Sequence, residues 1–101
     1  MIVTVASRHT EVTAPWKAYA EQKAGKLTKF FDRISEIEVV LDHVSDTMKV
    51  ELIVHAERND RFVAHHTDAD AYACMDACMD KMERILTDHK KKLRNRKHPE
   101  A

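Results

Sequence analysis

The sequence predicts one α+β domain with the element order β-α-β-β-β-α, in which two helices pack on one face of a four-stranded mixed sheet. Apolar residues in the last third of the chain recur every three, four and seven positions, which is typical of a long amphipathic helix. Apolar and polar residues alternate in the middle of the chain, as in strands with one wet face. Two helices that each carry a single apolar stripe need a sheet face to cover.

The first strand and the first helix occupy the N-terminal third. Residues 2–6 form a short β-branched run, which favours a strand. Thr13 is placed to cap a helix, and Pro15 falls in the first turn, where its missing N–H costs nothing. We expect this helix over about residues 14–33, with Gly25 in its middle. The glycine either weakens the helix by about 1 kcal/mol or allows another backbone or a ligand to approach closely.

Three strands then follow as an antiparallel meander. Residues 36–42 and 48–55 alternate apolar and polar side chains, and residues 44–47 turn the chain between them. Residues 57–60 predict a hairpin turn because Asn and Asp tolerate left-handed backbone. Residues 61–67 supply the last strand. The charged side chains of these strands are expected in water, on the face opposite the helices.

The last helix takes up most of residues 69–97. Residues 67–70 resemble a capping box that opens it. Its apolar stripe consists of Tyr72, Met75, Met79, Met82, Leu86 and Leu93. A strand-helix-strand start implies a right-handed parallel crossover. We expect residues 1–97 to form the domain and residues 98–101 to form a short C-terminal tail.

Charge is segregated along a chain that is neutral overall. The 101 residues hold 17 Lys and Arg against 17 Asp and Glu, so the total charge says nothing about partners. Residues 36–60, however, carry a net charge of −5, and residues 81–98 carry a net charge of +6. Such segregation can present a strong local potential on one side of a domain.

The sequence also bears on the compartment. Its N-terminus lacks the charged lead-in and apolar core of a signal peptide, and no apolar run approaches the length that spans a membrane. Two unframed cysteines and five methionines fit a reducing interior better than a secreted disulfide scaffold. We therefore expect a cytoplasmic protein without a membrane partner.

Cations form a second stripe on each predicted helix. The first helix carries Lys23, Lys26, Lys29 and Arg33, and the last carries Lys81, Arg84, Lys91 and Arg94 away from its apolar side. If the helices lie side by side, the two sets join in one basic surface that neutralises several phosphates with little base reading. This pattern predicts nucleic-acid or ribosome binding. The alternative is that exposed lysines merely keep the domain soluble.

Other chemistry has little support in the sequence. Cys74 and Cys78 lie one helical turn apart, supply at most two metal ligands and are interpreted as core thiols. His65 and His66 alternate faces on a strand and cannot point at one site. A nucleophile with its base and a Gly-rich phosphate loop are both missing from the sequence. We expect neither an enzyme nor a metal or other cofactor.

Three segments carry a resemblance to a known family. Residues 7–13 read SRHTEVT, residues 26–34 read KLTKFFDRI, and residues 70–93 carry Asp-x-Tyr-Ala, then Asp-Lys and Arg, and end in His-Lys-Lys-Lys-Leu. Taken together, in this order and spacing, they resemble the ribosome hibernation-promoting factors, also called ribosome-associated inhibitors. Long family members append a second domain that pairs two ribosomes, so a chain that ends at Ala101 resembles a short form.

The resemblance implies a translation inhibitor that acts under stress or in stationary phase. It would bind the small ribosomal subunit and its rRNA and would occlude the tRNA and mRNA channel. The positions that match the family's RNA contacts are Lys23, Lys26, Lys29, Arg33, Lys81, Arg84, Lys90, Lys91 and Lys92, with Arg8 and His9 after the first strand. The family usually has a cation where this chain has Asp88.

Short relatives differ in what they do to ribosome dimers. Some promote dimers with help from a separate small factor, and others block dimers through an extended tail. The brief segment after Arg94 favours the first kind. We expect a monomer away from the ribosome. The alternative function is a protein-interaction or modulator module that acts without RNA, because a methionine stripe can serve as a binding groove instead of a core.

Overall fold

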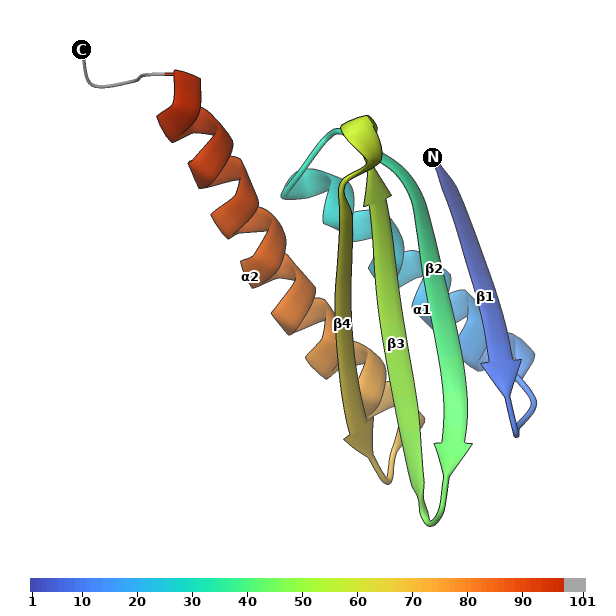
Figure 1. Ribbon diagram of the computed structural model, residues 1–101. Helices are drawn as coiled ribbons and strands as arrows, with labels where there is room; N and C mark the ends of the chain where they lie inside the picture. Colours follow the sequence, from blue (N-terminus) through green and yellow to red (C-terminus); the bar gives the residue numbers. More distant parts are fainter. Residues whose placement is uncertain (98–101) are drawn as a thin grey trace.

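The computed structural model describes residues 1–97 (Figure 1). The elements are β1 (Ile2–Arg8), α1 (Ala14–Gly25), η1 (Lys26–Lys29), β2 (Ile34–Val44), β3 (Thr47–Ala56), η2 (Glu57–Asn59), β4 (Arg61–Asp68) and α2 (Ala71–Lys97), where η1 and η2 are short 3₁₀ helices. The strand order is β1-β2-β3-β4, with β1 parallel to β2 and the other pairs antiparallel. Both helices cover one sheet face, which confirms the predicted fold class. The predicted tail, residues 98–101, lies outside the described residues.

The first helix begins as predicted and ends earlier. Thr13 caps it, with its side-chain oxygen accepting a hydrogen bond of 3.3 Å from the Trp16 N–H. The α-helical part ends at Gly25, so the prediction of a helix up to Arg33 was wrong for its last eight residues. Glycine is a poor helix former, and the Thr28 hydroxyl donates to the Gly25 carbonyl at 3.1 Å. The backbone then tightens into η1, and Arg33 lies in the connection to β2.

Gly25 itself is unremarkable in its surroundings. Its φ of −60° is ordinary right-handed helix, and a Cβ built on it would meet nothing within 4 Å. Within the described residues, no other backbone approaches this glycine closely. The glycine marks the point where α1 gives way to a 3₁₀ turn.

The core lies between the sheet and the two helices. Side chains at alternate positions of β2 and β3 are buried against the apolar stripes of α1 and α2. Met75, Met79 and Met82 belong to this core, as do Cys74 and Cys78. The methionine stripe is therefore part of the core and, within the described residues, is not an open protein-binding groove. The sheet contributes Ile37, Val39, Leu41, Val50, Leu52 and Val54.

The start of α2 differs in detail from the predicted capping box. The Asp70 carboxylate accepts a hydrogen bond of 2.9 Å from the Tyr72 N–H, and the Asp68 carboxylate accepts one of 3.0 Å from the Asp70 N–H. Asp70 therefore caps the helix, and Thr67 belongs to β4. Tyr72 was predicted within the apolar stripe but is 39% exposed. From this start α2 runs along the sheet, and its C-terminal turns extend away from the strands (Figure 1).

Candidate nucleic-acid interface

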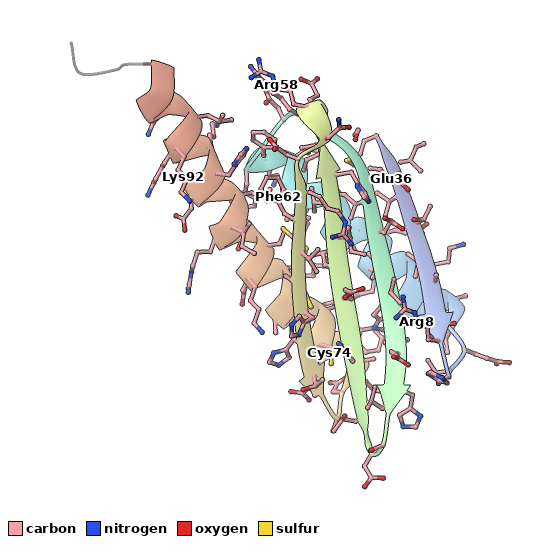
Figure 2. All side chains as sticks on the ribbon, in the orientation of Figure 1. Arg8, Glu36, Arg58, Phe62, Cys74 and Lys92 are labelled. Carbon is pink, nitrogen blue, oxygen red and sulfur yellow. The ribbon has the colours of Figure 1, made fainter. Side chains whose placement is uncertain are left out.

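The predicted RNA-binding cations lie on three different parts of the molecule. One set lines a groove between α1 with η1 and α2, a second lies on the flank of α2 next to β4, and a third surrounds the C-terminal turns of α2. Arg8 belongs to none of them and lies on the open face of the sheet (Figure 2). Their surroundings decide which of these cations are free to meet a polyanion.

The groove between the helices, of about 490 Å³, has mixed charge. Lys23, Lys26 and Lys29 line one side of it, and carboxylates of α2 line the other, namely Asp76, Asp80 and Glu83. Lys23 Nζ lies 3.9 Å from Asp76 Oδ1 and is half-buried, whereas Lys26 and Lys29 are exposed. An approaching phosphate would meet both signs here, so this groove alone is a weak site for a polyanion.

A polar junction holds the two helices together in this groove. The Tyr19 hydroxyl donates a hydrogen bond to Asp76, and Lys23 Nζ lies 5.3 Å from the centroid of the Tyr19 ring. Tyr72 packs edge-on against the same ring, with centroids 5.0 Å apart. The hydrogen bond to Asp76 is the largest cause that raises the pKa of Tyr19 to about 12. Lys23 is thus tied to the contact between α1 and α2.

Lys81 and Arg84 lie on the opposite flank of α2. They line a shallow surface with Val63, His65 and Ile85, next to β4. Lys81 Nζ donates a hydrogen bond of 2.8 Å to the His65 carbonyl and lies 3.3 Å from His66 Nδ1. Because β4 is an edge strand, this lysine covers a backbone group that another chain could otherwise pair with.

The predicted union of the two cationic stripes is therefore wrong for Lys81 and Arg84, whereas Arg33 and Arg94 do line one groove. Lys26 and Arg84 are separated by the width of α2, because the two grooves that contain them lie on its two sides. The sequence places each stripe correctly beside an apolar stripe, but the sense in which α2 is rotated toward α1 depends on the packing of the core. That rotation turns acids toward the lysines of α1.

The cations concentrate at the end of the molecule where α2 leaves the sheet. A groove of about 270 Å³, called here the distal groove, is lined by Phe31, Asp32, Arg33, Arg58, Lys90, Leu93 and Arg94. Four of these seven residues are cationic and only Asp32 is acidic. They come from three segments: the connection after η1, the turn between β3 and β4, and α2. Here the predicted candidates Arg33 and Lys90 do meet.

Sequence reasoning missed Arg58 as part of this site. The turn at residues 57–60 was predicted, but Arg58 was counted only in the charge of its segment. Arg58 has φ 66° and Asn59 has φ 64°, so two consecutive residues adopt left-handed backbone. Figure 2 shows Arg58 at the tip of this turn. A sequence signal would have been its position beside Asn59 in a tight turn, but its direction toward Arg33 depends on tertiary structure.

His89 lies beside the distal groove and packs against Phe31 in its wall. Its ring packs edge-on against Phe31 and Phe62, with centroids 5.4 Å and 4.7 Å apart. Its Nε2 lies 3.3 Å from Asp60 Oδ2, although the angles do not make a hydrogen bond. This histidine is a packed boundary residue between α2, β4 and the connection that carries Arg33.

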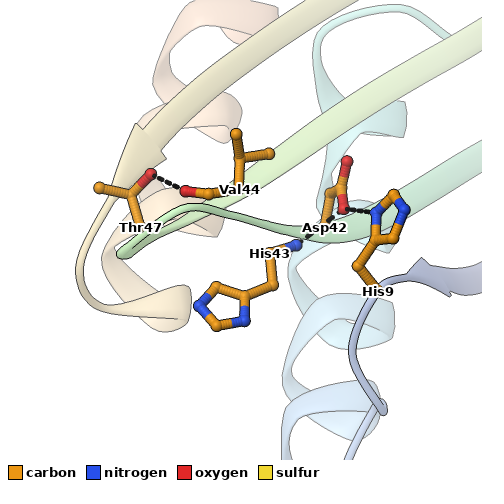
Figure 3. A network of polar contacts seen from close by, with 5 residues as sticks. All are labelled: His9, Asp42, His43, Val44 and Thr47. Atoms are coloured by element: carbon orange, nitrogen blue, oxygen red, sulfur yellow. Dashed lines mark hydrogen bonds and ion pairs between the residues drawn. The ribbon is translucent and has the colours of Figure 1, made fainter.

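Arg8 and His9 lie at the other end of the sheet. Arg8 shares a small depression of the open face with Asp42, Lys49 and Glu51. His9 Nδ1 lies 2.9 Å from Asp42 Oδ1, which also accepts a hydrogen bond of 2.8 Å from the His43 N–H (Figure 3). The hydrogen bond from His9 is the largest cause that lowers the pKa of Asp42. Both residues are thus separate from the distal groove, on a face with many acids.

The remaining predicted candidates make no hydrogen bond or ion pair with the side chains that the structure describes. Lys91 and Lys92 are exposed on α2, and Asp88 is exposed one turn earlier.

Across residues 1–97 no helix is long and apolar enough to cross a membrane. In the same part of the chain, no group of three or more His, Cys, Asp or Glu is arranged to hold a metal ion.

Comparisons with known proteins agree with the resemblance in the sequence. The model of the family described as "Sigma 54 modulation protein / S30EA ribosomal protein" matches residues 3–94. The chain is 33% identical over 92 residues to the ribosome hibernation promoting factor of Pseudomonas putida, which covers 91% of this chain and 89% of that protein. It is 31% identical over 94 residues to the factor of the same name from Escherichia coli strain K12, which covers 93% of this chain and 98% of that protein.

Two solved structures share the fold. The N-terminal domain of Thermus thermophilus Protein Y superposes with a TM-score of 0.79 at 24% identity, over 88% of this chain and 99% of that one. A ribosomal subunit interface protein from Coxiella burnetii superposes with a TM-score of 0.84 at 20% identity, over 90% of this chain and 99% of that one. The family model and the curated relatives show that the chain belongs to the Sigma 54 modulation protein / S30EA ribosomal protein family.

Proposed function

We propose that this protein is a ribosome hibernation factor, which binds the ribosome and holds it in a translationally silent state. Supporting this, relatives of that name align with more than 90% of the chain. The observation that carries the proposal is the cationic end of the molecule, where Arg33, Arg58, Lys90 and Arg94 surround one groove. Lys91 and Lys92 are exposed on the same part of α2. A surface of this charge suits the phosphate backbone of rRNA.

The finer proposal is that the small subunit and its rRNA are the binding site, and that the domain occludes the channel for tRNA and mRNA. The mechanism is steric, so no bond is made or broken and no cofactor takes part. Lys26 and Lys29 are exposed and can add phosphate contacts, whereas Lys23 and Lys81 are engaged within the protein. Binding through several Lys and Arg contacts to phosphate weakens steeply as salt rises.

Sedimentation with purified ribosomal subunits tests the proposal. The protein is expected to migrate with the small subunit at low salt and to dissociate at high salt. Charge reversal by Lys90→Glu with Lys91→Glu should abolish co-migration. The matched control reverses two cations outside the cationic end, Lys17→Glu with Lys49→Glu, and should leave most binding intact. A wild-type protein that stays at the top of the gradient at low salt would refute ribosome binding.

Occlusion is tested by competition. Small subunits loaded with mRNA and a tRNA should exclude the protein, and the protein should in turn block loading of the tRNA. Simultaneous, independent binding of tRNA and protein would contradict the occlusion mechanism while leaving ribosome binding in place. A separate ribosome-dimerising factor is a further proposed partner, and a dimer peak that needs both proteins in the gradient would reveal it.

One form of the alternative, an interaction module that acts without RNA through the methionine stripe of α2, has little support. It rested on the methionine stripe of α2 as an open groove. Met75 and Met82 are fully buried and Met79 is 8% exposed, so within the described residues this stripe offers no such surface.

A further inference from the structure

The distal groove combines two properties that a simple basic patch does not have. Its rim carries four cations on three separate segments, and its wall includes Leu93, which is half-buried, and Phe31, which is 5% exposed. Charge with an apolar wall suits a ligand that has an anionic and a flat apolar part. A volume of about 270 Å³ lies just below the range of about 300–1,000 Å³ for small-molecule sites.

The helix alone does not explain this concentration of charge. Lys90 and Arg94 lie in the last turns of α2, where cations interact favourably with the helix dipole. Arg33 and Arg58 are outside any α-helix and gain nothing from that dipole. They line the same groove as Lys90 and Arg94, and Arg33 and Arg58 also line a neighbouring hollow with Glu57 and Asp60. An anion bound among the four cations would relieve the repulsion among them.

The backbone conformation at Arg58 also supports a bound ligand at this groove. A non-glycine residue with φ near 60° is disfavoured, and here Arg58 and Asn59 adopt that conformation one after the other. Glycine would hold the turn without strain, yet position 58 carries a long cationic side chain at the rim of the groove. Backbone strain of this kind is often found where a side chain has to be presented to a ligand.

We infer that the distal groove binds one unpaired nucleotide of an RNA strand. Its phosphate would lie among Arg33, Arg58, Lys90 and Arg94, and its base would lie against Leu93 and a guanidinium plane of the rim. Unpaired bases are recognised by stacking on aromatic rings or guanidinium planes, together with charge contacts to the phosphate. This inference rests on the proposed function, since it names which part of a ribosome-bound RNA the cationic end would hold.

The test uses ¹⁵N-labelled protein titrated with a single-stranded hexauridylate, followed by NMR. Amide shifts are expected at residues 31–33, 57–59 and 90–94. Arg58→Gly removes the side chain and leaves a residue that accepts the left-handed turn, so it should fold normally and bind the hexamer about tenfold more weakly, as for one lost charge-assisted contact. The matched control is Arg61→Gln, which removes an exposed arginine three residues away, outside the groove, and should bind within about twofold of wild type.

Titrations with three further ligands test which kind of ligand the groove binds. Inorganic phosphate and uridine monophosphate are expected to bind the groove more weakly than the hexamer, and an RNA duplex is expected not to shift residues 31–33. Equal affinity for phosphate would overturn the role of the apolar wall, and equal affinity for the monophosphate would overturn an RNA strand as the ligand. Shifts that avoid the groove, or Arg58→Gly binding as tightly as Arg61→Gln, would overturn the site.

Sedimentation of the same protein with small subunits keeps the two proposals apart. If the wild type co-migrates while the groove stays silent toward the hexamer, only the nucleotide site fails. If the wild type does not co-migrate, the proposed function fails, whatever the hexamer does.

Discussion

Tyr19 on α1 donates a hydrogen bond to the carboxylate of Asp76 on α2, and this bond joins the two helices above the core. Lys23 contacts the same carboxylate at 3.9 Å. The two residues that hold Asp76 therefore come from successive turns of one helix. The junction uses a lysine that the sequence assigned to RNA.

The first prediction concerns alkaline pH. The pKa of Tyr19 is raised to about 12 from 10.0, so the bond to Asp76 stabilises the fold fully below pH 10 and loses its contribution as the pH rises toward 12. Urea unfolding from pH 8 to 12 should show a fall in the free energy of unfolding that Tyr19→Phe reduces. Tyr72→Phe is the control, because Tyr72 packs against the same ring and makes no bond to Asp76. Equal slopes in both variants would refute the role of this bond.

The second prediction concerns acid pH. The pKa of Asp42 is lowered from 3.8, chiefly by the hydrogen bond from His9, so its contribution is present above pH 3.8 and is lost as the pH falls below that value. Asp42→Asn should therefore flatten the acid limb of the stability curve. Glu36→Gln, on the same open face, should leave that limb unchanged. The measurement is chemical unfolding from pH 2.5 to 6, and an unaltered acid limb in Asp42→Asn would contradict the expectation.

The third prediction concerns Gly25. Its φ of −60° suits any residue and a Cβ there meets nothing within 4 Å, so Gly25→Ala should be tolerated without strain. It should stabilise the protein by about 0.4–1 kcal/mol, mainly because the unfolded chain has fewer conformations to lose. The reverse change at an exposed site of α1, Ala18→Gly, should destabilise it by a similar amount. Thermal and urea unfolding measure both, and a destabilised Gly25→Ala would show a constraint at this position.

The fourth prediction concerns the two thiols. Burial raises the pKa of Cys78 to about 12 and is the largest cause that raises the pKa of Cys74. The Cys78 thiol also donates to the Val50 carbonyl at 3.2 Å. Because the thiolate is the reactive form, iodoacetamide at pH 7.5 should modify both residues slowly in the folded protein and rapidly in urea. Mass spectrometry over time measures this, and fast labelling of the native protein would contradict the buried placement.

The fold was predictable because apolar residues recur in the sequence with the two periods that are typical of strands and helices. Alternation of apolar residues at every second position marks β2 and β3, and the 3.6-residue stripe marks α2. The order of the elements then leaves few topologies, since a parallel crossover is right-handed. The end of α1 was missed because helix periodicity continues through Lys26, Lys29 and Arg33, even though the backbone changes to 3₁₀ geometry at Gly25.

The arrangement of charges was predictable only along each element. The packing of the core sets how α2 is rotated, and no local pattern encodes that rotation. The rotation places Lys81 beside β4 and leaves Lys26 facing acids. Arg58 was missed for a similar reason, because its left-handed backbone is set by the tight link between β3 and β4. The role of these residues in RNA binding remains a prediction.

The path of α2 away from the strands has a mechanical consequence. With 27 residues at about 1.5 Å each, the helix is a lever roughly 40 Å long. The first half of the helix, around Met75 and Met82, is packed in the core, and the second half carries the cationic end. From Met82 to Lys97 the helix is about 22 Å long, so a tilt of about 5° at Met82 would displace its end by roughly 2 Å. Substitutions deep in the core can therefore misalign the charges without unfolding the protein.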